Sequence, residues 1–176
     1  MRYINKNIIE AFNKLRLEKK KVVLLWTSNT SLTPKGNVVM GAGLAKQMVS
    51  EFKGIKRLAS ETLAKFPTES YKKDKYGNSI ALKYAGVHTV YSKENAAIMA
   101  FPVKRAYWEN AEIGIIKKSM RELKMVCKNK PDTVFLLNMP GVGAGRLKVK
   151  DVELAIASVV KTIPNLYIFL LDKQVK

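Results

Sequence analysis

The sequence predicts an α/β fold, a sheet with helices on both faces. Apolar runs without alternation occur at residues 22–26, 97–101 and 133–139, as expected for strands that are buried on both sides. Segments with apolar residues at helical spacing alternate with them along much of the chain. Together these two observations predict a three-layer α/β/α arrangement around a central sheet that is mixed where short strands follow one another.

The composition limits the class of protein. With 176 residues, 47% of them apolar, we expect one domain over residues 1–176 with a single core. The 32 Lys and Arg outnumber the 14 Asp and Glu, which gives a net charge of +18 and favours a polyanionic partner such as nucleic acid or a phosphorylated ligand. The same charge also serves solubility, so it does not identify the partner by itself.

Cysteine and histidine are scarce. The single cysteine, Cys127, excludes an intrachain disulfide, and with the single histidine, His88, it cannot form a Cys/His zinc site. We therefore expect no metal and no cofactor, and a reducing compartment. Residues 1–10 lack a signal-peptide core, and no apolar run approaches the ~18 residues needed to cross a bilayer. These features predict a cytoplasmic monomer without a membrane partner.

The first half of the chain is expected to form a helix, a strand and another helix. The helix begins near Ile4 and ends in the basic residues 16–21, and the strand at 22–26 follows directly. A helix then starts at the glycines of residues 41–43 and continues toward Phe66, with Gly54 as a candidate break and Pro67 as its end.

The polar residues 67–79 predict a surface loop, whose Tyr71 and Tyr76 suit either base stacking or partly buried anchoring. Three short strands, at 80–84, 87–91 and 96–101, are expected to form an antiparallel or mixed part of the sheet. His88 is interpreted as a half-exposed structural residue of the middle strand.

The last part predicts helix, strand, helix and strand. Residues 113–127 have helical spacing that places Cys127 on the core face, and a buried strand follows at 133–139. Asp151 is the expected N-cap of the final helix, which runs to about Ile163, and residues 166–171 form the last strand.

Polar and glycine-rich segments follow two of the buried strands. The strand at 22–26 ends in Thr27, Ser28 and Asn29, and Gly41-Ala42-Gly43 then opens a helix whose free N–H groups can hold a phosphate. A tight turn that needs glycine only for its backbone angles is the alternative. A second cluster, residues 141–145, follows the strand at 133–139 and favours a ligand site, because loops gather where strands end.

Three motifs resemble those of the macro-domain family, which binds ADP-ribose, and the resemblance covers about residues 22–171. They are Asn29-Thr30-Ser31-Leu32, Met40-Gly41-Ala42-Gly43-Leu44-Ala45 and Met139-Pro140-Gly141-Val142-Gly143-Ala144-Gly145. The resemblance implies that Asn29 contacts the distal ribose and that the two glycine loops hold the diphosphate. The implied ADP-ribose-binding residues are Thr27, Ser28, Asn29, Met40, Gly41, Ala42, Gly43, Leu44, Pro140, Gly141, Val142, Gly143, Ala144, Gly145 and Arg146.

Phe101-Pro102-Val103-Lys104 is similar to the Phe-Pro-Thr-Lys of the macro-domain branch that removes ADP-ribose from DNA bases, in which the lysine is catalytic. The resemblance therefore implies Asn29 and Lys104 as catalytic residues, with Lys104 near the anomeric carbon. Lys104 also lies just beyond a buried strand, where α/β folds collect their chemistry. Two roles remain open for it, proton transfer or nucleophilic attack after a lowered pKa, and simple pairing with a phosphate.

The chain departs from the family in three places. It lacks the Gly-Asp-Ile or Gly-Asp-Leu whose aspartate reads adenine. Gly145 is followed by Arg146 and Leu147, without the aspartate of the branch that acts on glutamate-linked ADP-ribose, which disfavours that mechanism. Residues 33–37 form a longer insert, which either adds contacts or only connects the segments on either side of it.

These observations predict a metal-independent hydrolase that removes ADP-ribose from a nucleic acid or a protein. One alternative is a phosphatase acting on ADP-ribose 1″-phosphate, for which His88 and Asp151 are the candidate acid or nucleophile. The other is a non-catalytic ADP-ribose reader or a basic nucleic-acid-binding module.

Overall fold

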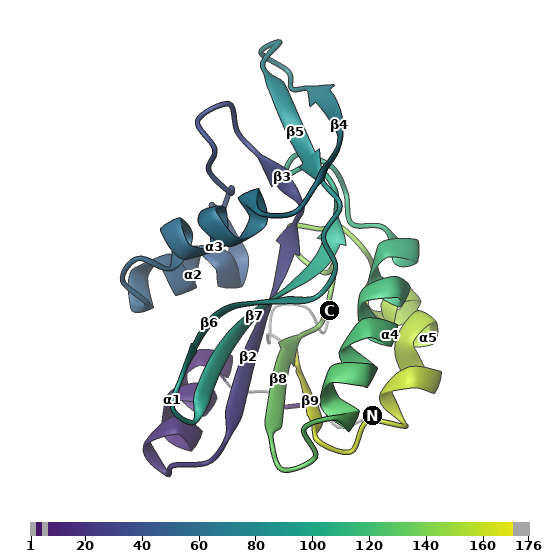
Figure 1. The fold of residues 1–176 in the computed structure, drawn as a ribbon. Helices are drawn as coiled ribbons and strands as arrows, with labels where there is room; N and C mark the ends of the chain where they lie inside the picture. Colours follow the sequence, from purple (N-terminus) through teal and green to yellow (C-terminus); the bar gives the residue numbers. More distant parts are fainter. Residues whose placement is uncertain (1–2, 5–6, 171–176) are drawn as a thin grey trace.

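In the computed structural model, which describes residues 3–4 and 7–170, a six-stranded mixed sheet lies between two layers of helices (Figure 1). β6 is antiparallel to β7, and all other neighbours in this sheet are parallel. The predicted α/β/α arrangement with a central mixed sheet is confirmed. In order across the sheet, the strands are β1 (Tyr3–Ile4), β9 (Leu166–Phe169), β8 (Val134–Asn138), β2 (Val22–Asn29), β7 (Ala96–Lys104) and β6 (His88–Lys93).

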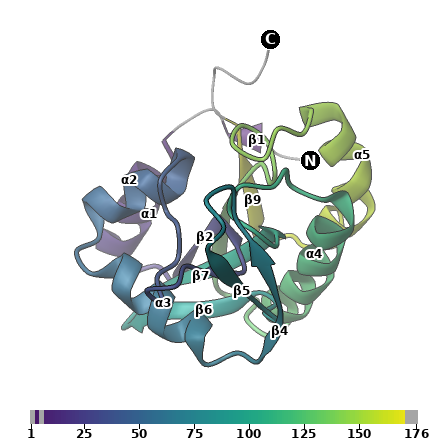
Figure 2. The same cartoon turned by 90° about the horizontal axis from the view of Figure 1, so that it is seen from above.

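Each face of the sheet carries its own helices, as the view from above shows (Figure 2). One layer contains α1 (Ile8–Leu17), α2 (Gly43–Glu51) and α3 (Ile55–Ala64), and the other contains α4 (Ile113–Lys128) and α5 (Val149–Val160). None of the helices in the described part of the chain is long and apolar enough to cross a membrane.

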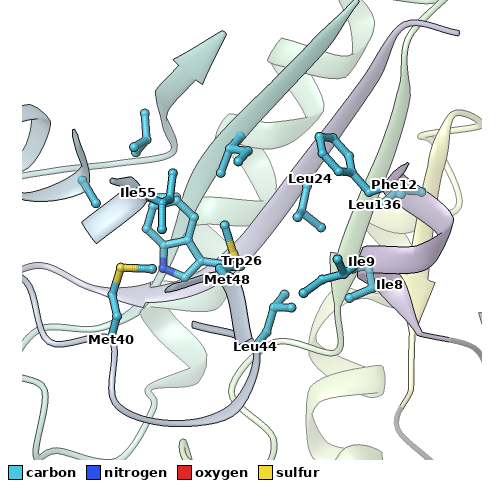
Figure 3. Packing of buried hydrophobic residues seen from close by; sticks show 14 of the residues in the cluster. Ile8, Ile9, Phe12, Leu24, Trp26, Met40, Leu44, Met48, Ile55 and Leu136 are labelled. Atoms are coloured by element: carbon cyan, nitrogen blue, oxygen red, sulfur yellow. The ribbon is translucent and has the colours of Figure 1, made fainter. Parts of the chain in front are cut away.

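The middle strand β2 contributes to both cores. Leu24 and Trp26 pack with the first helical layer (Figure 3), whereas Val23 and Leu25 pack with the second. All four side chains are at most 3% exposed. This explains why the strand is a continuous apolar run, since a strand with only one buried face would alternate.

A second, smaller sheet lies beyond the carboxyl ends of β2 and β7. It is antiparallel and consists of β3 (Ser31–Leu32), β5 (Ser79–Lys83) and β4 (Thr68–Lys73) in that order. Figure 1 shows β4 and β5 as a hairpin that projects from the body of the molecule. Two expectations were therefore wrong: residues 68–73 are a strand instead of a loop, and β5 does not join the main sheet.

Helix boundaries differ at two places. The first helix begins at Ile8, because the Asn7 side chain accepts a hydrogen bond from Ile9 N at 2.9 Å and caps it, while Ile4 belongs to β1. The last helix begins at Val149, so Asp151 lies in its first turn and is not the N-cap. The break at Gly54 is confirmed, with a φ of +82° between α2 and α3. Residue 171, the expected end of the last strand, lies outside the described residues.

His88 and Cys127 have the structural positions that were predicted. His88 is half-buried on β6, where its Nδ1 lies 2.8 Å from Gly86 O and burial lowers its pKa. Cys127 is 2% exposed on the core face of α4, and burial raises the pKa of its thiol to about 12. Neither residue lines the pocket described below.

Candidate functional site

A pocket of about 420 Å³ lies where β2, β7 and β8 reach their carboxyl ends. Its walls are the end of β2, the N-terminus of α2, the last two residues of β7 with residues 107–109 after it, and the glycine loop after β8. The volume falls in the range of about 300–1,000 Å³ that is typical of small-molecule sites. Ligands of α/β proteins bind at this edge of the sheet.

A β-bulge at the end of β7 aligns two of the candidate catalytic residues. Ser28 pairs with Pro102 and Asn29 pairs with Lys104, so Val103 is an extra residue on β7. A bulge changes the direction of the side chains that follow it, because one residue is left unpaired. As a result Asn29 and Lys104 are neighbours across the two strand ends, and both line the pocket.

Hydrogen bonds fix the amide of Asn29. Its Oδ1 accepts from Ser31 N at 3.2 Å and from Ser31 Oγ at 2.8 Å, and its Nδ2 donates to Val39 O at 3.2 Å. Ser31 Oγ also accepts from Tyr107 N at 3.2 Å, which ties the end of β2 to the opposite wall. An amide NH₂ has two hydrogens, so Asn29 keeps one donor for a ligand in a preset direction.

Lys104 is half-buried in the pocket wall and donates a hydrogen bond from Nζ to Glu109 O at 2.9 Å. Burial lowers the pKa of its ammonium below the usual range, and the positive charge of Arg146 lowers it further, whereas the Glu109 carboxylate opposes them. Lys104 thus loses its proton at a lower pH than an exposed lysine does.

The N-terminus of α2 presents backbone donors to the pocket. The helix begins at Gly43, and its N-cap, Ala42, has no side chain that can cap it. The first intrahelical bond from this end runs from Lys46 N to Ala42 O, so the N–H groups of Gly43, Leu44 and Ala45 have no partner within the helix. Gly43 has a φ of +55°, and a Cβ built there meets nothing within 4 Å. Such a helix start can hold an anion, and glycine at residue 43 leaves the approach to its N–H groups free of a side chain.

The second glycine loop is a compact turn. Arg146 N donates to Gly143 O at 2.9 Å, and Leu147 N donates to Gly141 O at 3.1 Å. Gly141 has a φ of +76°, and a Cβ on Gly145 would collide with the carbonyl oxygen of Gly141. Only glycine allows the chain to fold so tightly on itself at these two positions. Gly143 and Ala144, at the tip, are exposed.

Most of the residues predicted to bind the ligand line this single pocket. Met40 and Pro140 do not: Met40 is 6% exposed and packs in the core near Trp26 (Figure 3), and Pro140 is buried. The insert at residues 33–37 closes on itself through Thr33 N and Asn37 O, 2.9 Å apart, and does not line the pocket either. The predicted residues that line it are Thr27, Ser28, Asn29, Gly41, Ala42, Gly43, Leu44, Lys104, Gly141, Val142, Gly143, Ala144, Gly145 and Arg146.

Sequence reasoning missed one wall, made by Tyr107, Trp108 and Glu109. The rings of Tyr107 and Trp108 meet edge to face with their centroids 4.8 Å apart. The aromatic pair, which follows Lys104 closely in the sequence, is a signal that could have identified this wall. Among the described residues, no group of three or more His, Cys, Asp or Glu side chains is placed to hold a metal ion.

The floor of the pocket contains two buried polar atoms without a partner in the described part of the protein, Ser28 Oγ and Asn138 Oδ1. Asn138 was also missed, although it is a polar residue at the end of a buried strand, the same signal that identified Ser28 and Asn29. An unpaired buried polar group costs about 1–3 kcal/mol, which a ligand hydroxyl or a water can recover. The floor therefore suits a ligand with hydroxyl groups.

No protein-family model matches the sequence, and no curated protein is similar enough to count as a match. Solved structures do resemble this chain. The macrodomain of Mycobacterium tuberculosis DarG aligns with 18% identity and a TM-score of 0.65, over 96% of this chain and 95% of that one. The macrodomain of Thermus aquaticus DarG aligns with 17% identity and a TM-score of 0.65, over 97% of each chain.

A third structure, Thermosipho africanus DarTG in complex with ADP-ribose, aligns with 17% identity and a TM-score of 0.62, over 88% of this chain and 39% of that one. At these identities the similarity establishes the fold. The chain has the macrodomain fold.

Proposed function

We propose that this macrodomain-fold chain binds ADP-ribose across the carboxyl ends of β2, β7 and β8 and hydrolyses the bond that joins an ADP-ribosyl group to a macromolecule. One observation carries the proposal: both glycine loops line the same pocket as the adjacent Asn29 and Lys104. The ligand of the Thermosipho africanus structure supports it.

The diphosphate lies between the N-terminus of α2 and the loop at residues 141–146. Backbone N–H groups and Arg146 supply its hydrogen bonds and positive potential, and the donors are in place before the ligand arrives. The free N–H of Asn29 donates to a hydroxyl of the distal ribose, whose other hydroxyls reach the polar floor at Ser28 and Asn138.

Lys104 then lies beside the anomeric carbon. Hydrolysis breaks the bond from this carbon to the attached group, while water gives its hydroxyl to the carbon and a proton to the leaving group. A lysine with a lowered pKa can take up and release such a proton more readily than an exposed lysine. The hydrogen bond to Glu109 O holds Nζ in one position for this step.

The arrangement favours a hydrolase over the alternative phosphatase. The phosphatase needs an acid or nucleophile, and neither of its candidates lines the pocket, since His88 packs against Phe66 and Asp151 is exposed on α5. A non-catalytic reader differs from a hydrolase in what Lys104 does, because binding alone requires no proton transfer.

The test is product analysis with three substrates, namely ADP-ribosylated DNA, ADP-ribosylated protein and ADP-ribose 1″-phosphate, together with calorimetry of free ADP-ribose. We expect binding of ADP-ribose and its release from at least one macromolecule by the wild type, with release lost in Lys104→Ala. Phosphate release from ADP-ribose 1″-phosphate would support the phosphatase instead. Binding without any turnover would make the protein a reader.

A further inference from the structure

We propose that the β4–β5 hairpin, residues 68–83, is a docking surface for single-stranded nucleic acid, presented beside the mouth of the pocket. Figure 1 shows the hairpin projecting beyond the carboxyl ends of β2 and β7, and Figure 2 shows it above that edge of the sheet. The proposal builds on the proposed function only in that the bound strand is the one that carries the ADP-ribosyl group.

The two faces of the hairpin differ in character. Ile80 and Leu82, which are 1% and 5% exposed, point toward the body of the protein, and Lys72, the cross-strand partner of Ile80, lies on the same face. The outer face carries Tyr71 and Lys73, which pair across the strands with Ala81 and Ser79. Because successive side chains of a strand point to opposite faces, Tyr71 and Lys73 share the solvent side with two small neighbours. That side is open enough for a planar base.

The turn of the hairpin presents a second aromatic ring on a rigid support. Asp74 Oδ1 accepts from Tyr76 N and Asn78 N, both at 2.9 Å, and Gly77 adopts a φ of +81°. This ordered turn leaves Tyr76 74% exposed, with Lys75 Nζ 4.8 Å from the centre of its ring. Tyr71 is 69% exposed. Two tyrosines held in solvent by ordered backbone have no role in the core.

The acidic groups of the hairpin are already used within the protein. Glu69 forms an ion pair with Arg105, and Asp74 Oδ2 accepts from Tyr107 OH at 3.3 Å. In the part of the chain that the structure describes, Lys73 and Lys75 form no ion pair. The outward surface therefore offers two tyrosines and two lysines without ion pairs, and the charge of Glu69 is compensated by Arg105, whereas Asp74 keeps its charge and bonds to Tyr107 of the pocket wall.

The same contacts attach the hairpin to the pocket wall. Lys72 pairs with Glu109, and Tyr107 bonds to Asp74, while Tyr107 and Glu109 both line the pocket. Through Lys72 on its inward side and Asp74 in its turn, the hairpin is fixed relative to the pocket wall, where Glu109 O accepts a hydrogen bond from Lys104 Nζ. The docking surface on the outer side of the hairpin is thereby held in a fixed place next to the pocket wall.

The occupant follows from the chemistry of the surface. Single strands bind through phosphates paired with cations and through bases stacked on aromatic side chains, and the hairpin offers both. A duplex presents its bases only at their edges, so it has no use for exposed rings. An acidic protein segment uses the lysines but gains little from the tyrosines. The net charge of +18 raises the rate of encounter with any such polyanion.

The test uses fluorescence anisotropy with a labelled, unmodified oligothymidylate of about 20 nucleotides, a length that spans one binding surface. The double variant Tyr71→Ala/Tyr76→Ala is expected to weaken binding at least about tenfold, because a base can no longer stack on either ring. Lys73→Gln/Lys75→Gln is expected to reduce the slope of log K against log salt by about 1.4, because two phosphates are no longer neutralised.

The control is Tyr91→Ala/Lys93→Gln, which removes the same types of residue from the exposed edge strand β6 and should keep the wild-type affinity. Circular dichroism and thermal unfolding confirm that every variant folds. The proposal is overturned if the wild type does not bind the oligonucleotide, if the hairpin variants bind like the control, or if polyglutamate of equal charge displaces the strand as well as unlabelled oligothymidylate does.

The oligonucleotide carries no ADP-ribose, so this outcome is separate from calorimetry of free ADP-ribose. The proposed function is rejected and the hairpin surface supported if the hairpin variants lose oligonucleotide binding but the wild type does not bind ADP-ribose. The hairpin surface alone is rejected if the wild type binds ADP-ribose but the hairpin variants keep oligonucleotide binding.

Discussion

Replacement of Gly43 by valine tests whether the N-terminus of α2 holds the diphosphate. A Cβ at this position meets nothing within 4 Å, and the residue lines the pocket, so the new side chain projects into the space of the ligand. If the diphosphate cannot reach two backbone donors, the binding free energy falls by about 1.5–3 kcal/mol for each lost hydrogen bond to the charged group. Even the lower total, about 3 kcal/mol, weakens affinity by about 100-fold, since each 1.4 kcal/mol is about tenfold.

The same substitution also strains the backbone, because the φ of Gly43 is +55°. A left-handed conformation costs a non-glycine residue about 1–2 kcal/mol, less than the stability of about 5–15 kcal/mol of an ordinary domain, so the variant should fold. Gly36→Val is the matched control: its φ is +72°, its Cβ is equally free of contacts, and it does not line the pocket. Both variants should lose similar stability on thermal unfolding, but only Gly43→Val should lose ADP-ribose binding by calorimetry. Equal affinity of the two folded variants would refute the assignment of the diphosphate to α2.

Three further predictions concern Lys104, Arg146 and Cys127. Lys104→Arg keeps the charge but cannot release a proton at working pH, so turnover on an ADP-ribosylated substrate should fall at least about 100-fold while ADP-ribose affinity stays nearly constant; near-full turnover would make the residue purely electrostatic. If neutral Lys104 is required, kcat should rise with pH through its lowered pKa, and Arg146→Gln, which removes a charge that lowers this pKa, should move the inflection of the pH–rate profile to higher pH. Cys127, whose pKa burial raises to about 12 from an ordinary 9.0, should react with iodoacetamide roughly a thousandfold more slowly at neutral pH in the native protein than in denaturant.

The sheet and both glycine loops were predictable because their signals are local. Residues 22–26 are apolar without interruption, as burial on two faces requires, and the glycine clusters follow buried strands, the first after a polar loop and the second within three residues. Gly141 and Gly145 are required by one loop's own geometry, so the sequence around them already indicates a tight turn.

The hairpin and the last helix show where local signals are insufficient. All six residues of β4 are exposed, and the strand exists because its backbone pairs with β5, so no apolar pattern marks it. At the last helix Asp151 is the best capping residue by type, but the helix starts earlier, at Val149, whose side chain packs against the second core. In both places contacts between distant segments override the local preference.

The pocket wall at residues 107–109 depends on contacts of the same long-range kind. Glu109 is placed by its pair with Lys72, and Tyr107 by hydrogen bonds to Ser31 and Asp74, all from residues more than 30 positions away. A sequence motif records the residue types of such a wall but not the partners that hold it.

The relation between Asn29 and Lys104 depends on a single extra residue. In a regular parallel pair, continuing the register from Ser28 and Pro102 would match Asn29 with Val103, and Lys104 would point to the opposite face of the sheet. The bulge at Val103 shifts the register by one, so the amide and the ammonium become neighbours at the same edge. The motif Phe101-Pro102-Val103-Lys104 therefore acts through spacing as well as through its lysine: Pro102 fixes the backbone before the bulge, Val103 is inserted, and Lys104 is turned toward the pocket.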